Sequence, residues 1–265
     1  MDLGMHGETA VVTASSSGLG KAAATALARE GVDVAINGRD RDRLDETVTE
    51  IRAVAADGTT VIGHAGDITD PAVPAALVTA AVEEFGRLDH LVTSAGGPPP
   101  GLLLETTDED WYEAFDLLVM SVVRSVRAAA DHLRADDGGS VVNITSRTVK
   151  EASDSIVLSN SVRMAVIGLQ KTLSRELAPD VRANAVLPGA HETSRIQNLL
   201  SEAVERGEYE DYESARADRV GGIPVGFMGA PLDLGNAVAY LCSEQARYIN
   251  GAAIPVDGGE HRSTL

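Results

Sequence analysis

Short apolar runs alternate with longer alanine-rich stretches along almost the whole chain. The short runs predict strands at Thr9–Thr13, Val32–Asn37, Thr60–Gly63, His90–Ser94, Ser140–Ile144, Arg182–Val186 and Ala252–Val256. The longer stretches predict helices at Gly18–Glu30, Arg41–Ala56, Val73–Phe85, Asp108–Arg134, Ser155–Leu177 and Pro231–Leu241. Because strands and helices alternate, we expect an α/β fold, a doubly wound parallel sheet of about seven strands in a single domain covering residues 1–265.

Residues 191–229 break this alternation. The segment is polar and charged, carries Tyr209 and Tyr212, and predicts an inserted helical lid over a substrate pocket rather than a domain boundary. Its arginines are accompanied by many carboxylates, so the sequence alone shows no clear site for an anion. Apolar residues that are candidates to line the pocket are Leu102–Leu104, Ile223, Val225, Phe227 and Met228.

The composition indicates which kinds of binding partner are unsuited to this protein. The 22 Lys and Arg residues face 40 Asp and Glu residues, so the formal charge is −18. Such an acidic protein is a poor binder of nucleic acids or anionic membranes, which need clustered cations, and we expect a small-molecule substrate instead. The single cysteine, Cys242, excludes an intrachain disulfide and a cysteine-based metal site, and we expect no metal. No apolar run reaches a membrane span of ~18 residues and the first residues lack a signal-peptide core, so we expect a cytoplasmic protein.

The turn after the first predicted strand carries candidate chemistry. Gly18 and Gly20 stand between that strand and the following helix. Glycines at this place let the backbone approach a pyrophosphate, which the helix N-terminus also attracts. Two glycines by themselves also fit an ordinary glycine-rich turn.

The segment from Thr13 to Gly20 resembles the T-G-x-x-x-G-x-G pattern of the short-chain dehydrogenase/reductase family. Ala14 stands where the family has its first glycine, and its methyl group disfavours a positive φ. Further motifs follow in the family's order: Asp67-Ile68, Ser94-Ala95-Gly96, Val142–Ser146, Pro188-Gly189 with Thr193, and Asp257-Gly258-Gly259. The resemblance implies a Rossmann fold and a set of cofactor-binding residues. These are Thr13, Ser15, Ser17, Gly18, Leu19, Gly20, Arg39, Asp67, Ile68, Ser94, Ala95, Gly96, Arg163, Pro188, Gly189 and Thr193.

The end of the second predicted strand bears on which nicotinamide cofactor binds. NAD-selective members of the family usually have an acidic residue at the position of Gly38. The next residue, Arg39, is suited to a 2′-phosphate, so the sequence favours NADP(H) over NAD(H). Two points stand against this. Arg39 also fits a solvated cation near Asp40 and Asp42, and Ser15–Ser17 holds no basic residue.

The family's catalytic pattern is altered in this chain. The resemblance implies a serine, a tyrosine thirteen residues later, a lysine four residues beyond it, and an asparagine on the preceding long helix. Here the serine is Ser146, but Ser159 stands in the tyrosine position, Arg163 in the lysine position and Leu118 in the asparagine position. A serine hydroxyl is a much weaker acid than tyrosine, and arginine stays protonated, so the usual proton relay cannot operate. We take Ser146, Ser159, Arg163 and Lys150 as candidate catalytic residues, with His191 or a water held by the two serines as other proton sources.

Three functions remain open on this pattern. The first is an NADP(H)-dependent oxidoreductase that transfers a hydride to or from a carbonyl or alcohol with a non-standard Ser/Ser/Arg centre. The second is an NADP-binding protein that is catalytically silent, a sensor or partner subunit. The third is a non-redox enzyme similar to the halohydrin dehalogenases, which resemble this family and have arginine in the lysine position.

The resemblance also bears on substrate and assembly. Length and motif order are most similar to the 3-oxoacyl-carrier-protein reductases. In this family the helices that correspond to Trp111–Arg134 and Ser155–Leu177 form a four-helix interface, so we expect a homotetramer, with a homodimer next. The last residues, 260–265, are candidates to reach across such an interface.

Overall fold

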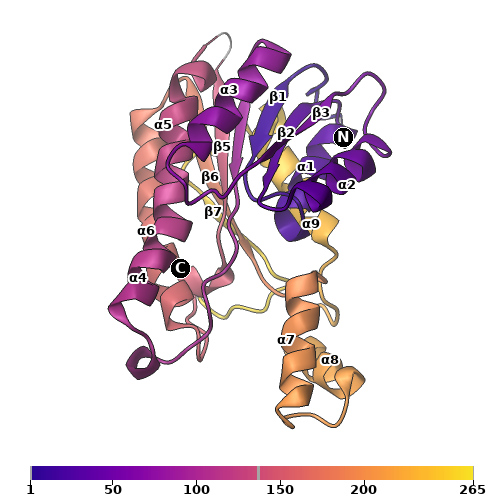
Figure 1. Ribbon diagram of the computed structural model, residues 1–265, viewed down its shortest axis with the longest axis vertical. Coiled ribbons are helices and arrows are strands. Elements are labelled where there is room, and N and C mark those ends of the chain that lie inside the picture. The colour runs from indigo at the N-terminus through magenta and orange to yellow at the C-terminus, as the bar shows by residue number, and fades with distance from the viewer. Residues whose placement is uncertain (1, 136–137, 265) are drawn as a thin grey trace.

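The computed structural model describes residues 2–135 and 138–264, and its centre is one sheet of parallel strands (Figure 1). The strands are β1 (Thr9–Val12), β2 (Asp33–Gly38), β3 (Val61–Ala65), β4 (His90–Thr93), β5 (Gly139–Ile144), β6 (Val181–Pro188) and β7 (Ala253–Val256). They pair in the order β3-β2-β1-β4-β5-β6-β7, all in parallel. The prediction of a doubly wound, single-domain Rossmann fold is confirmed.

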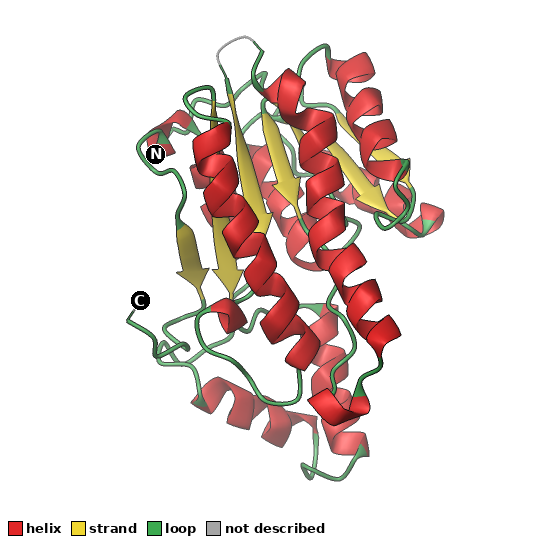
Figure 2. Cartoon of the chain, turned by 90° about the vertical axis from the view of Figure 1, so that its left-hand side faces the viewer, coloured by secondary structure: helices red, strands yellow, loops and turns green. Residues whose placement is uncertain are grey.

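Helices cover both faces of the sheet. They are α1 (Gly18–Arg29), α2 (Arg41–Arg52), α3 (Val73–Phe85), α4 (Asp108–Phe115), α5 (Ser121–Leu133), α6 (Val157–Glu176), α7 (Ser194–Glu205), α8 (Tyr212–Gly221) and α9 (Pro231–Cys242). Short 3₁₀ turns are η1 (Leu103–Glu105), η3 (Arg147–Val149) and η4 (Glu244–Ala246). Helices α1, α2 and α9 pack on one face, and α3, α5 and α6 pack on the other. Figure 2 shows the second face in front, with α7 and α8 beyond the end to which the strands point.

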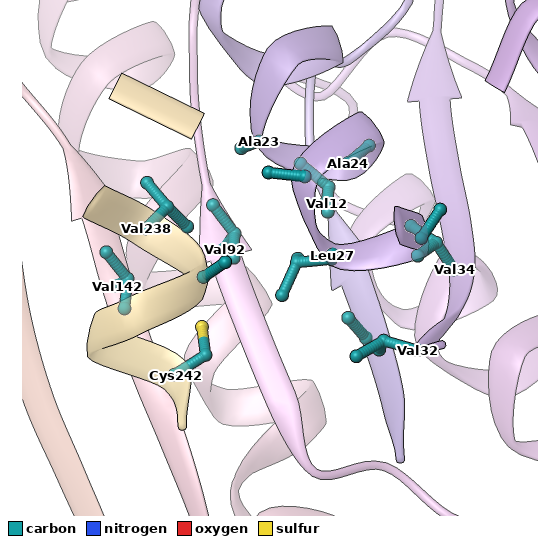
Figure 3. Close-up of a cluster of buried hydrophobic side chains, with 14 of the residues drawn as sticks. Val12, Ala23, Ala24, Leu27, Val32, Val34, Val92, Val142, Val238 and Cys242 are labelled. Atoms are coloured by element: carbon teal, nitrogen blue, oxygen red, sulfur yellow. The ribbon is translucent and has the colours of Figure 1, made fainter. Parts of the chain in front are cut away.

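Alternation along each strand separates the two apolar cores. Val12 of β1 and Val34 of β2 point to the core under α1 and α9, whereas Val11 and Ala35 point to the other core. Figure 3 shows the first core, where Leu27 of α1 lies near Val12 of β1 and Val92 of β4, and Val142 of β5 lies near Val238 and Cys242 of α9. This packing fixes α1, whose N-terminus faces the loop after β1.

The stretch predicted as one helix over Asp108–Arg134 is interrupted. Between α4 and α5, Asp116–Met120 forms a π-helical turn, named η2. The Arg124 guanidinium donates to the Thr69 carbonyl at 2.9 Å and pairs with the Asp116 carboxylate at 2.7 Å. The wider turn buries Leu118 toward the sheet.

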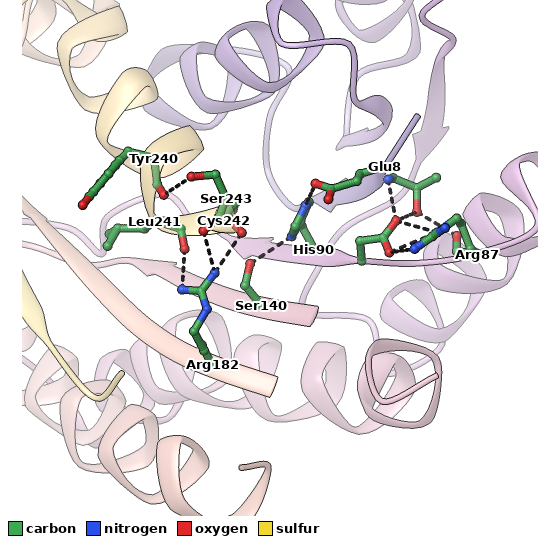
Figure 4. Close-up of polar contacts among 11 residues, drawn as sticks. Glu8, Arg87, His90, Ser140, Arg182, Tyr240, Leu241, Cys242 and Ser243 are labelled. Carbon is green, nitrogen blue, oxygen red and sulfur yellow. Dashed lines mark hydrogen bonds and ion pairs between the residues drawn. The ribbon is translucent and has the colours of Figure 1, made fainter. Parts of the chain in front are cut away.

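A polar layer closes the amino ends of the central strands (Figure 4). The Arg182 guanidinium donates to the carbonyls of Leu241, Cys242 and Ser243, and so satisfies the free end of α9. Burial raises the pKa of the Cys242 thiol to about 12, so this cysteine is an inert packing residue.

No helix in the described part of the chain is long and apolar enough to cross a membrane.

The contact between α1 and α9 supports a test of the fold. A Cβ atom on Gly235 of α9 would collide with the backbone carbonyl of Ala22 on α1. We expect Gly235→Ala to lower the free energy of unfolding by about 1–3 kcal/mol, because α1 and α9 must move apart to make room for the new methyl group. Gly221→Ala at the end of α8, where a Cβ meets nothing within 4 Å, is the control. Urea denaturation measures both, and equal stabilities would contradict the packing.

Candidate active site

A cleft of about 600 Å³ opens at the carboxyl edge of the sheet, where β1 and β4 lie side by side. The chain order reverses between these two strands, and ligands of doubly wound folds bind at this switch point. Many residues expected from the sequence line the cleft. They are Ser17, Gly18, Leu19, Gly20, Ser94, Ala95, Gly96, Ser146, Ser159, Arg163, Pro188, Gly189 and Thr193.

The turn after β1 keeps the shape of the glycine pattern although one glycine is replaced. Ala14 has φ 45° and donates its N–H to the Asn37 side-chain oxygen at 3.2 Å. The left-handed conformation costs an alanine about 1 kcal/mol. A Cβ atom on Gly20 would lie 2.7 Å from the Ala14 carbonyl oxygen, so only glycine fits there. The turn is a cradle of suitable shape for a pyrophosphate at the N-terminus of α1.

Two residues expected to bind cofactor support this cradle from behind. The Ser15 hydroxyl donates to the Val12 carbonyl at 2.6 Å and accepts the Asn37 N–H at 3.0 Å. The Thr13 hydroxyl donates to the Ser94 carbonyl at 2.7 Å and accepts the Ser94 N–H at 2.8 Å. These side chains therefore join the turn after β1 to β2 and to the loop after β4.

The far end of the site lies at the tips of β2 and β3. A Cβ atom on Gly38 would lie 2.6 Å from the Ser16 side chain, so an acidic residue does not fit there without movement of Ser16. Arg39 is 80% exposed, and its guanidinium lies 3.8 Å from the Asp67 carboxylate. A hydrogen bond from the Thr69 backbone lowers the pKa of Asp67, while Ile68 is buried beneath. The exposed cation of Arg39 thus follows directly after Gly38, the position where an acidic side chain does not fit.

The structure brings Ser146, Ser159 and Arg163 together in the cleft. The Arg163 guanidinium on α6 donates to the Ser159 hydroxyl at 3.1 Å, to the Thr145 carbonyl at 3.1 Å and to the Gly96 carbonyl at 3.4 Å. Burial, with the nearby positive charge of Arg195, lowers the pKa of Arg163 to about 10. Arg163 is therefore still protonated at neutral pH and cannot act as a proton acceptor there. The Ser146 hydroxyl accepts the Thr148 N–H at 3.2 Å.

Leu118, which stands in the family's asparagine position, offers no polar atom to a water beside Arg163. Leu118 lines a void of about 10 Å³ together with Thr93, Ser94 and Arg163. A void of this size barely admits one water, and leucine gives it no hydrogen-bonding partner. A water chain anchored on this helix is therefore not supported.

The two other proton-source candidates lie at the sides of the site. Lys150 follows η3 and does not line the cleft. His191 lines the cleft and is buried against Gly229, and this burial lowers its pKa. His191 is therefore neutral at pH 7, with its Nδ1 3.2 Å from the Gly189 carbonyl.

Three lining arginines were not among the residues expected from the sequence. Arg147 directly follows Ser146, which is the one signal that could have singled it out. Arg195 of α7 and Arg219 of α8 also line the cleft. Arg147 and Arg219 both contact the Glu260 carboxylate, whose side chain is only 6% exposed. Glu260 therefore contacts two cleft arginines of its own chain.

Comparisons with known proteins agree with this geometry. Residues 13–261 match the family model described as enoyl-(acyl carrier protein) reductase. The chain is 33% identical to the L-rhamnose 1-dehydrogenase (NAD(P)(+)) of a Sphingomonas strain, covering 96% of each chain. It is 32% identical to human dehydrogenase/reductase SDR family member 4, covering 95% of this chain and 87% of the relative. The L-sorbose reductase of Gluconobacter frateurii, solved with NADPH and L-sorbose, superposes with a TM-score of 0.93 at 31% identity over 98% of both chains. The chain therefore belongs to the short-chain dehydrogenase/reductase family of oxidoreductases.

Proposed function

We propose that the protein is an NADP(H)-dependent oxidoreductase that acts on a carbonyl or alcohol with a Ser146/Ser159/Arg163 centre. One observation carries the proposal: the nucleotide cradle and these three polar side chains line the same cleft. When bound, a nicotinamide cofactor supplies or accepts the electron pair of the reaction. The residues that would hold it are the turn at Ser17–Gly20, the loop at Ser94–Gly96 and Pro188, Gly189 and Thr193.

Each polar side chain has a distinct task in this proposal. The Ser146 hydroxyl accepts from a backbone N–H, so its own proton is available to a substrate oxygen in the cleft. The Ser159 hydroxyl likewise accepts from Arg163 and has its proton available. Arg163 fixes Ser159 and offers positive charge, and a water held between the two serines supplies or takes up the proton. Residues 191–229, which carry α7 and α8, act as the lid over this site.

The other two functions are weaker on this geometry. A non-redox enzyme similar to the halohydrin dehalogenases has no need of the cradle that Ala14 maintains at a cost in strain. A silent NADP-binding protein is favoured by one observation, the apolar Leu118 beside Arg163. The variants of the catalytic positions described below separate this possibility from an active enzyme.

Arg39 is the proposed basis of cofactor preference. Arg39→Ala removes the cation that pairs with Asp67 at the tips of β2 and β3. We expect NADPH affinity to fall roughly tenfold because charge-assisted hydrogen bonds to the 2′-phosphate are lost. NADH affinity should stay unchanged. Nicotinamide fluorescence titration measures both cofactors, and Arg41→Ala, at an exposed cation that begins α2, is the control. Equal losses for NADPH and NADH would contradict the assignment.

The catalytic positions can be tested by restoring the family pattern. We expect Ser159→Tyr with Arg163→Lys to raise the rate of carbonyl reduction about 10- to 100-fold, since tyrosine is a far better proton donor than serine. Each single variant should gain less, because tyrosine and lysine act as a pair. NADPH oxidation at 340 nm measures the rate. Turnover that survives Ser146→Ala undiminished would overturn the proposed centre.

We also propose that the protein is a homotetramer, with a homodimer as the next candidate. Apolar side chains form an outward groove of about 410 Å³ along α4, η2 and α6. Its apolar residues are Trp111, Tyr112, Phe115, Met120 and Val162. Exposed apolar surface of this kind on a folded chain marks an interface.

The groove gives a direct test of assembly. Phe115, 45% exposed, should be covered in the oligomer, so Phe115→Glu should split a homotetramer into dimers, or a homodimer into monomers, as measured by light scattering after gel filtration. Val54→Glu, at a residue 42% exposed beyond α2, should leave the native mass unchanged. A monomeric native protein, or an oligomer that Phe115→Glu leaves intact, would contradict this surface.

A further inference from the structure

The tertiary structure sorts the lid arginines into two groups. Arg206 pairs with Glu208 at 2.6 Å, and Arg216 pairs with Glu192 at 2.7 Å, with both pairs on the exposed surface. Arg195 and Arg219 instead line the cleft. Arg216 and Arg219 lie three residues apart on α8, yet one is neutralised outside and the other faces the site.

A buried carboxylate ties two of the cleft arginines together. The Glu260 Oε1 atom lies 3.0 Å from Arg147 and 2.5 Å from Arg219. Its Oε2 atom is 3.4 Å from the Ala190 N–H. The C-terminal segment is itself fixed, because the Arg262 N–H donates to the Glu151 carboxylate at 2.7 Å. Glu260 thus holds one arginine from the loop after β5 and one from the lid against the same wall of the cleft.

Both arginines keep most of their hydrogen-bonding capacity. Each gives one nitrogen to Glu260, and within residues 2–135 and 138–264 neither guanidinium makes another hydrogen bond or ion pair. An arginine has five N–H donors in a rigid fork suited to a carboxylate. The Thr148 hydroxyl, on the same loop and lining the same cleft, is buried and has no hydrogen-bond partner among the described residues. The site thus has spare donors on side chains that are partly or fully buried.

The charge balance of the cleft is opposite to that of the protein. Among the described residues that line it, the cations are Arg147, Arg163, Arg195 and Arg219, and the only acidic residue is Asp154. Adding the adjacent Glu260 gives 4 − 2 = +2 for the site, against −18 for the chain. Such a local excess attracts an anion.

We propose that the substrate is an oxo acid or hydroxy acid whose carboxylate binds to Arg147 and Arg219. This rests on the proposed oxidoreductase function, in which Ser146 contacts the reacting oxygen. Arg147 directly follows Ser146, so the carboxylate and the carbonyl belong to one small molecule. The pair already binds a carboxylate, that of Glu260, which shows that its geometry suits this group. A neutral sugar, or a thioester carried on a protein, leaves the spare donors unused.

Matched substrates and matched variants test the proposal. The probes are short 2-oxo and 3-oxo acids, their methyl esters, and N-acetylcysteamine thioesters of the same 3-oxo acids. We expect the native protein to prefer the free acids, and Arg219→Gln to raise KM for an acid about tenfold or more while KM for the ester changes less than twofold. Arg219→Lys should recover part of the loss because it keeps the charge. Arg216→Gln, on the same helix but paired outside, should match the native protein.

A binding measurement separates this proposal from the function on which it rests. Calorimetric titration of the acids and esters is carried out with and without NADPH. Acids that bind more tightly than their esters, with a loss in Arg219→Gln but unchanged NADPH affinity, support the carboxylate site. Esters or thioesters that bind or react as well as the acids overturn the carboxylate site and leave the oxidoreductase function standing. Protein that binds the acids in the same Arg219-dependent way but no NADPH keeps the carboxylate site and overturns the function.

Discussion

Two hydrogen bonds between Thr13 and Ser94 hold the site together at the point where the order of the strands reverses. The Thr13 hydroxyl donates to the Ser94 carbonyl and accepts the Ser94 N–H, so the loops after β1 and β4 have one fixed separation. The other sides of the cleft are positioned relative to this pair of loops. Parallel pairing from β4 through β5 to β6 brings Ser146 and Pro188 to the same edge of the sheet, and α1 begins on its other side. The sheet register therefore places Ser146 and Pro188, whereas Ser159 and Arg163 are placed by α6.

The cleft is also marked by its positive charge, which comes from the arginines that line it. Arg163 is buried and hydrogen-bonded to two carbonyls and a hydroxyl, with no carboxylate paired to it in the described chain. A buried charge without a counter-ion is costly, and the lowered pKa of Arg163 expresses that cost. Arg195 adds a second positive charge nearby. An anionic ligand in the cleft would reduce the cost of holding these two charges together.

In the proposed function, serine and arginine stand where the family has tyrosine and lysine, so a water molecule rather than a side chain supplies or takes up the proton. Ser146 and Ser159 have hydroxyl protons that can orient a water or a substrate oxygen, but neither is acidic enough to replace tyrosine. Arg163 preserves the hydrogen-bonding and positive charge of the lysine position without its ability to titrate near neutral pH. An enzyme of this kind depends on positioning and charge for its rate, which is consistent with a cleft in which arginines converge.

The sequence by itself determined the sheet, the nucleotide cradle and the altered catalytic positions, because these are recorded in local patterns and in fixed spacings along the chain. It placed the strands within a few residues, but it missed the π-helical turn at Asp116–Met120, whose wider hydrogen-bonding leaves no distinct pattern. It also indicated that Ala14 disfavours a positive φ, whereas a hydrogen bond to Asn37 of β2 accompanies alanine at φ 45° in the folded turn. Only the tertiary structure decided which lid arginines face the cleft and that Glu260 lies between two of them. The ion pairs of Glu260 join residues more than 40 positions apart in the sequence. Whether two such charges meet depends on their distance in the folded chain, which cannot be read from local sequence patterns.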